Sequence, residues 1–159
     1  MSNSVVIDTN VIIHYISRDG CYFESCEWII FKIKEGEIKI TIDHNGIIFN
    51  EYDRKIREYS RNVSAKILMN LIGRHRFNPT SSSIFEFVDP IDSKDIKNLK
   101  KIGFHDGDLI FVRVSPKSSS KKIISTDYRS FLKQKYKNWI KSKLNVDVID
   151  PIDFYRSAK

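Results

Sequence analysis

Short apolar runs typical of β-strands alternate along the chain with longer segments whose apolar residues recur at helical spacing. The apolar runs predict strands at residues 4–8, 37–42, 84–88 and 121–125. The segments between them predict helices at residues 10–18, 22–35, 47–61, 63–75, 93–102, 106–115 and 128–143, and turn chemistry predicts a loop at 78–83. This alternation favours a parallel sheet covered by helices on both faces, a three-layer α/β/α fold forming one domain over residues 1–159.

Two of the predicted strands lead into an aspartate. Asp8 follows the apolar residues 5–7, and Asp127 follows the strand-like residues 121–125. Groups at the carboxyl end of a strand in an open α/β sheet face the crevice where ligands bind. Asp8 alone is equally well explained as a helix N-cap, since aspartate is favoured there. Because the pattern of a strand followed by an aspartate occurs twice, we favour the interpretation that the carboxylates of Asp8 and Asp127 share one site.

Glu51 and Asp106 are two further acidic candidates, because one follows the second predicted strand and the other opens the predicted helix at 106–115. Asp108 could compete with Asp106 for the same role. The apolar residues 109, 110 and 112 predict that Asp106 faces the strand ends, whereas Asp108, rotated by roughly 200° at helical pitch, faces away. Clustered carboxylates repel one another unless cations neutralise them. Oxygen ligands of this kind suit Mg²⁺ or Mn²⁺.

From residue 5 to about residue 155 the chain resembles the PIN-domain nucleases, a family that includes many single-domain toxin ribonucleases. Five segments carry the resemblance in the family's order: IDTN at 7–10, NEY at 50–52, FHDGDLI at 104–110, STDYRSF at 125–131 and VDVIDP at 146–151. One departure is Gly107, where the family usually has alanine.

The resemblance implies a closing fifth strand within residues 146–151 and thus a five-stranded sheet. It also implies the strand order 3-2-1-4-5, which brings the ends of the first and fourth strands side by side. It also implies a metal-dependent endoribonuclease in which Asp8, Asp106 and Asp127 hold Mg²⁺ or Mn²⁺ and a metal-activated water attacks phosphorus. Glu51 would complete the acidic pocket. The supporting positions are Thr9, Asn10, Ser125, Thr126 and Asp108. The resemblance also implies RNA rather than DNA as the substrate. It implies an antitoxin or another regulatory protein as a possible partner, and a homodimer is a further possibility.

The charge balance favours a polyanionic partner. The chain carries 27 Lys and Arg against 20 Asp and Glu, a formal net charge of +7, and residues 113–143 hold ten basic residues and one acidic residue. The candidates for contacts to nucleic acid are Lys117, Lys121, Lys122, Arg129, Arg54 and Arg57. A solvated helix face would explain part of this basic excess equally well. Apolar residues recur every four positions from Tyr128 to Leu144, which predicts a core-facing stripe rather than a surface for stacking bases.

Several other classes of protein fit less well. The absence of an apolar run of about 18 residues argues against a transmembrane helix, and the start of the chain lacks the features of a signal peptide, which places the protein in the cytoplasm. The main alternative is a non-catalytic module of the same fold that binds nucleic acid or acts as a scaffold. A phosphatase with Asp8 as the nucleophile would need a second aspartate at position 10, where Asn10 stands.

Overall fold

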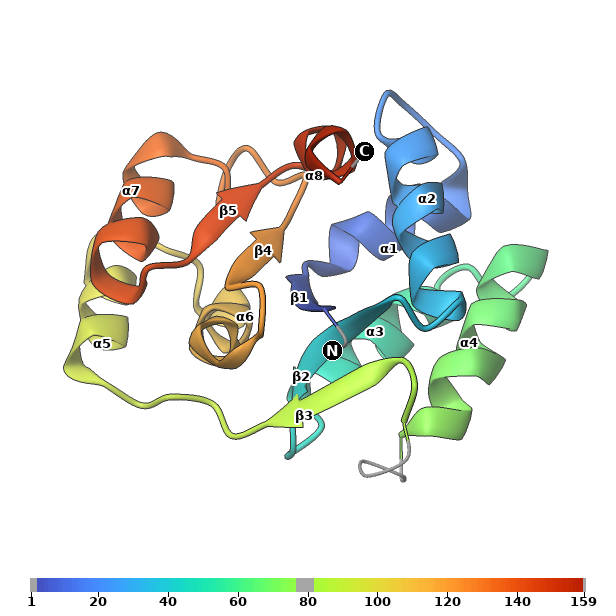
Figure 1. The fold of residues 1–159 in the computed structure, drawn as a ribbon, viewed down its shortest axis with the longest axis horizontal. Helices are drawn as coiled ribbons and strands as arrows, with labels where there is room; N and C mark the ends of the chain where they lie inside the picture. Colours follow the sequence, from blue (N-terminus) through green and yellow to red (C-terminus); the bar gives the residue numbers. More distant parts are fainter. Residues whose placement is uncertain (1–2, 77–81, 159) are drawn as a thin grey trace.

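The computed structural model describes residues 3–76 and 82–158, so most of the loop predicted at 78–83 lies outside the described residues. Its centre is a five-stranded sheet in the order β3-β2-β1-β4-β5, and every neighbouring pair of strands is parallel (Figure 1). The strands are β1 (Asn3–Ile7), β2 (Ile38–Asp43), β3 (Phe85–Val88), β4 (Lys122–Ile124) and β5 (Asp147–Ile149). Both the predicted fold class and the strand order are confirmed.

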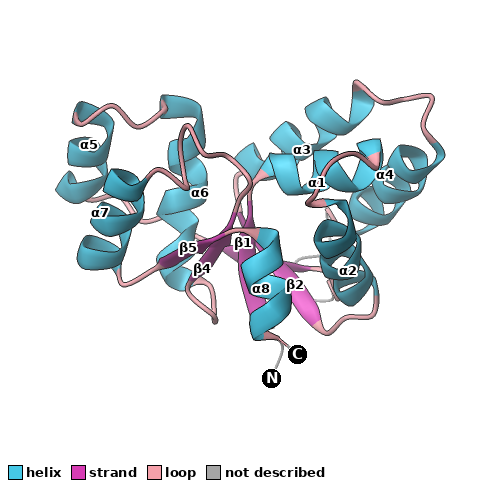
Figure 2. Ribbon diagram, turned by 90° about the horizontal axis from the view of Figure 1, so that it is seen from above, coloured by secondary structure: helices cyan, strands magenta, loops and turns pink. Residues whose placement is uncertain are grey.

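Helices lie on both sides of this sheet and give the molecule its three layers. Helices α5, α6 and α7 gather on one side of the molecule and α1 to α4 on the other (Figure 2). The helices are α1 (Thr9–Ser17), α2 (Phe23–Lys34), α3 (Ile47–Arg57), α4 (Val63–His75), α5 (Lys94–Lys101), α6 (Leu109–Val114), α7 (Gln134–Leu144) and α8 (Pro151–Ser157). Short 3₁₀ turns at Asp106–Asp108 and Ser115–Lys117 flank α6. In the part of the chain described here, none of the helices is both long and apolar enough to cross a membrane.

Strand β1 occupies the centre of the sheet and the centre of the core. Its residues Val5, Val6 and Ile7 are fully buried, as are Ile123 and Ile124 on the neighbouring strand β4. Continuous apolar runs of this kind are expected where a parallel strand is covered on both faces. Because β1 is held by β2 on one side and β4 on the other, the residue that follows it is fixed at the middle of the carboxyl edge.

The segment after Asp127 differs from its prediction. Helix α7 begins at Gln134 rather than at residue 128, and residues 128–133 form turns instead. The Asp127 carboxylate accepts hydrogen bonds from the backbone N–H groups of Arg129 (2.8 Å) and Ser130 (3.2 Å), so it stabilises a turn that competes with a helix. Tyr128 is consequently 62% exposed, and its predicted place in a core-facing stripe is wrong.

The last helix, α8, was not predicted from the apolar pattern. Asp150 precedes it, and its side chain accepts a hydrogen bond from the Asp153 N–H at 2.8 Å, while Pro151 occupies the first helical position. Both features are typical of a helix start. A signal for this helix was therefore present in the sequence, although its seven residues, about two turns, are too few to show a clear apolar period.

Candidate functional site

Asp8 lies directly after β1, where its backbone N–H donates to the Ile124 carbonyl of β4 at 2.9 Å. Only 4% of the residue is exposed. Its backbone occupies the N-cap position of α1, yet within the described part of the chain its side chain forms no capping hydrogen bond. The carboxylate instead accepts hydrogen bonds from the Ser125 hydroxyl (2.8 Å) and the Asn10 amide (3.4 Å). A capping role therefore does not explain why an acid stands here.

The surroundings of Asp8 disfavour its charge. Burial raises the pKa of the Asp8 carboxyl to about 7, the Ser125 hydrogen bond opposes this shift, and the nearby charges of Asp108 and Asp127 add to it. A carboxylate that is both desolvated and close to other carboxylates is costly unless a cation compensates for it. Carboxylates with strongly shifted pKa values are common at functional sites, because catalysis or binding requires them there even though they do not stabilise the fold.

This raised pKa predicts how the stability of the metal-free protein depends on pH. Between pH 3.8 and about 7 the folded state holds a proton on Asp8 that the unfolded chain has released, so the free energy of unfolding falls as pH rises through this window. The difference corresponds to at most roughly 4 kcal/mol. Urea unfolding in EDTA should therefore show that Asp8→Asn gains stability relative to the wild type at pH 8 but not at pH 4. An equal pH dependence in both proteins would contradict the buried, charged state of Asp8.

Asp108 and Asp106 take places opposite to those predicted. The Asp108 carboxylate accepts a hydrogen bond from the Ser130 hydroxyl (3.0 Å) and lies 3.8 Å from the His105 ring nitrogen. Its pKa is raised by burial, with further contributions from the charges of Asp127 and Glu51. The Asp106 side chain is 72% exposed and forms an ion pair with Lys100 of α5 at 3.1 Å.

The places of Asp106 and Asp108 follow from the local backbone structure. Residues 106–108 form a 3₁₀ turn, and α6 begins only at Leu109. Because this turn does not continue α6 at the α-helical pitch, the directions of Asp106 and Asp108 relative to the apolar residues of α6 differ from those predicted. Asp108 occupies the N-cap position of α6 and contacts Ser130. Asp106 instead contacts Lys100 of α5. Of the two acids, Asp108 is the one whose charge acts on Asp8.

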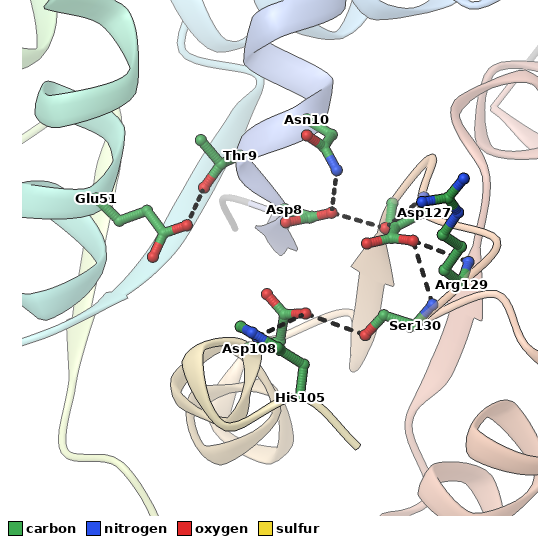
Figure 3. A network of polar contacts seen from close by, with 10 residues as sticks. Asp8, Thr9, Asn10, Glu51, His105, Asp108, Asp127, Arg129 and Ser130 are labelled. Atoms are coloured by element: carbon green, nitrogen blue, oxygen red, sulfur yellow. Dashed lines mark hydrogen bonds and ion pairs between the residues drawn. The ribbon is translucent and has the colours of Figure 1, made fainter. Parts of the chain in front are cut away.

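Glu51 approaches the same region from α3. Its carboxylate accepts a hydrogen bond from the Thr9 hydroxyl at 3.3 Å, which connects α3 to the first residue of α1. Figure 3 shows Asp8, Glu51, Asp108 and Asp127 around one region, each contributed by a different segment of the chain. The structure thus places three of the four predicted acids around one region, and Asp108 takes the place of Asp106 there.

Ser125 connects two of these acidic segments. Its hydroxyl donates to Asp8 and accepts the backbone N–H of Asp127 at 3.0 Å. Thr126 is half-buried between Ser125 and Asp127 in the chain. The predicted supporting residues Thr9, Asn10 and Ser125 therefore contact site carboxylates directly. Ser130 was missed; the signal in the sequence is the aspartate at 127, because an aspartate can hydrogen-bond the backbone two residues further on and so form the turn that contains Ser130.

The structure separates the predicted lysines from the acids. Lys122 begins β4 opposite Asp147 of β5, and Lys121 and Lys117 precede it, so all three lie toward the amino edge of the sheet. The three residues of β4, about 10 Å of strand, stand between them and the segment that leads to Asp127. Any contact of these lysines with nucleic acid would therefore lie at the opposite edge of the sheet from the acids.

The three predicted arginines lie on two different parts of the molecule. Arg129 is exposed and lies next to Asp127 (Figure 3), so it adds a positive charge at the acidic edge. Arg54 and Arg57 project from α3 with side chains that are 62% and 63% exposed, and they pair with acids one helical turn away. The pairs are Arg54 with Glu58 and Arg57 with Asp53.

Asp43 shows that one acid at this edge is structural. It ends β2 and is fully buried, and its two oxygens accept the backbone N–H groups of Ile47 and Ile48, each at 2.9 Å. These bonds satisfy two of the free donors at the start of α3. The contrast with Asp8 is informative, because Asp43 serves a helix start and Asp8 does not.

The donor set is compatible with a hard divalent cation, since it consists of carboxylate oxygens supported by hydroxyl and amide groups. Across residues 3–76 and 82–158, however, no three acidic, histidine or cysteine side chains are gathered closely enough to form a ready metal-binding group. The side chains are therefore candidate ligands that face a common region, and cation binding would have to draw them together.

Comparison with known proteins does not assign this chain to a family. No protein-family model matches the chain, and no curated protein matches its sequence. A function for this chain therefore has to be argued from the chemistry of the site and from the motif resemblance.

Proposed function

We propose that this chain is a divalent-metal-dependent phosphodiesterase of the PIN-domain type that cleaves nucleic acid, with RNA as the favoured substrate. The observation that carries this proposal is the state of Asp8. It is a buried carboxylate at the central strand end, it caps no helix within the described chain, and its strongest charged neighbours are other carboxylates. A bound cation would convert this unfavourable cluster into a favourable one.

Asp8, Asp108 and Asp127 would hold Mg²⁺ or Mn²⁺, and Glu51 would contribute directly or through water. When bound, the metal lowers the pKa of a coordinated water and stabilises the leaving oxygen in an in-line displacement. The chain's own groups keep the ligands in place.

Orientation of the ligands is the task of the neighbouring polar side chains. Ser125 and Asn10 hold the Asp8 carboxylate, and Thr9 holds Glu51. Ser130 and His105 flank Asp108. Hydrogen bonds to metal ligands of this kind commonly affect metal affinity or activity by about 10–100-fold. The positions of these groups therefore support a site arranged for a metal rather than for stability alone.

The net charge of +7 supports a polyanion as the substrate, and the placement of Arg129 at the acidic edge supports contact with a phosphate there. The preference for RNA over DNA comes from the PIN-domain resemblance. A non-catalytic nucleic-acid-binding module is the second candidate, favoured by the finding that the described acids do not form a ready three-ligand group.

Removal of metal separates these two functions. The purified protein should cleave labelled RNA in Mn²⁺ or Mg²⁺, and EDTA should stop cleavage, with activity returning when excess Mn²⁺ is added. The products are followed on denaturing gels. RNA binding without cleavage in either metal would support the non-catalytic module, and cleavage that persists in EDTA would exclude the proposed chemistry.

A further inference from the structure

Tyr128 is a large aromatic side chain left exposed beside the acidic site. It follows Asp127 directly, precedes the exposed Arg129, and is itself 62% exposed. The turn that the Asp127 carboxylate stabilises keeps this residue out of α7 and therefore out of the core. The ring is therefore available for contact at the surface next to Asp127.

The Tyr128 ring is anchored by its hydroxyl end. Its hydroxyl is hydrogen-bonded to the hydroxyl of Tyr22, which is only 8% exposed and immediately precedes α2. The two ring centroids lie 6.4 Å apart, and on its other side Tyr22 contacts the His14 ring of α1 at 5.4 Å. Burial raises the pKa of the Tyr22 hydroxyl, so this hydroxyl stays protonated at neutral pH. The exposed ring is thus held by a buried one rather than swinging freely.

We propose that Tyr128 is a positioning residue that stacks against an unpaired nucleobase adjacent to the phosphodiester at the acidic site. This inference rests on the proposed nuclease function. Stacking of bases on exposed aromatic rings is a general means of binding single strands, because every base has a π-face. Arg129, next in the chain, would contact the backbone phosphate. A base inside a duplex is already stacked on its neighbours, so the ring selects a nucleotide that is unpaired.

Binding of two oligomers tests this role. The first is a short single-stranded RNA, and the second is a ribose-phosphate oligomer of the same length that carries no bases. Fluorescence anisotropy is measured with Asp8→Asn protein in Mg²⁺, to keep the RNA intact. Tyr128→Ala should weaken RNA binding roughly tenfold or more and leave binding of the abasic oligomer nearly unchanged.

Three further variants separate stacking from folding. Tyr128→Phe keeps the ring and should retain most of the RNA affinity although it loses the bond to Tyr22. Tyr128→Leu keeps apolar bulk and should behave as Tyr128→Ala. Phe31→Ala is the matched control, because Phe31 is 52% exposed near the end of α2 that leads to the amino end of β2. Phe31→Ala should change neither the affinity for the single-stranded RNA nor the affinity for the abasic oligomer.

The possible failures are distinguishable. If Tyr128→Ala binds RNA as its parent does, or loses affinity for both oligomers equally, the stacking role is wrong. Metal-dependent cleavage by the wild type would then still uphold the nuclease proposal. If the wild type neither binds nor cleaves RNA, both proposals fail together.

Discussion

Asp8→Asn is expected to lower metal-dependent RNA cleavage by a factor of at least about 100, since even the hydrogen-bond partners of metal ligands commonly contribute 10–100-fold. The substitution keeps the shape of the side chain and can still accept the Ser125 hydrogen bond, but it removes the charge that would hold the metal. Because Asp8 is buried near Asp108 and Asp127, removal of its charge should not destabilise the metal-free protein at neutral pH. Cleavage rates and urea unfolding in EDTA check the two parts.

A matched control is Asp53→Asn on α3, where the acid forms an ion pair with Arg57 in a solvent-accessible position. This variant should cleave RNA at the wild-type rate. The alternative explanation of Asp8 as a helix cap makes a different prediction, because asparagine caps as well as aspartate and activity would survive. Wild-type cleavage by Asp8→Asn would therefore remove the central acid from the mechanism.

Asp108→Asn is expected to impair cleavage by at least about tenfold, whereas Asp106→Asn should remain close to the wild type. Asp108 is half-buried and its pKa is raised in part by the charges of Asp127 and Glu51, so it belongs to the acidic cluster. The Asp106 side chain is 72% exposed and pairs with Lys100, and an exposed pair of this kind contributes little to stability. Initial cleavage rates in Mn²⁺ at saturating RNA provide the comparison.

The pair of variants is its own control, since both substitutions are chemically identical and lie two residues apart. Loss of activity in Asp106→Asn with a normal Asp108→Asn would mean that the 3₁₀ turn at Asp106–Asp108 rearranges when metal or RNA binds. Equal loss in both variants would mean that the turn as a whole, rather than one carboxylate, is required.

The sheet could be predicted from the sequence because its strands are buried on both faces. Apolar runs such as residues 5–7 have few other places in a small domain, and each predicted strand is present within one or two residues of its expected bounds. The strand order came from the PIN-domain resemblance. Together these placed Asp8 and Asp127 at one edge, and the hydrogen bonds through Ser125 agree with that placement.

The errors arise where local hydrogen bonds override periodicity. The every-four spacing from Tyr128 onward predicted a helix, but the Asp127 side chain stabilises a turn that removes Tyr128 from it. The choice between Asp106 and Asp108 depended on a 3₁₀ turn and on an ion pair with Lys100 of another helix. The sequence did not show where Lys122 lies relative to Asp127, because the two residues are close in the chain but are separated by the length of β4.

Direct titration of Mn²⁺ into the metal-free protein tests the central claim, that the buried Asp8 carboxylate is a metal ligand. Isothermal titration calorimetry at pH 8, with Asp8→Asn and Asp53→Asn titrated under the same conditions, measures binding without reference to any substrate. We expect saturable binding to the wild type and to Asp53→Asn, and binding weakened at least about tenfold by Asp8→Asn. Equal Mn²⁺ affinity in the wild type and Asp8→Asn, or no saturable binding to the wild type, would contradict the account.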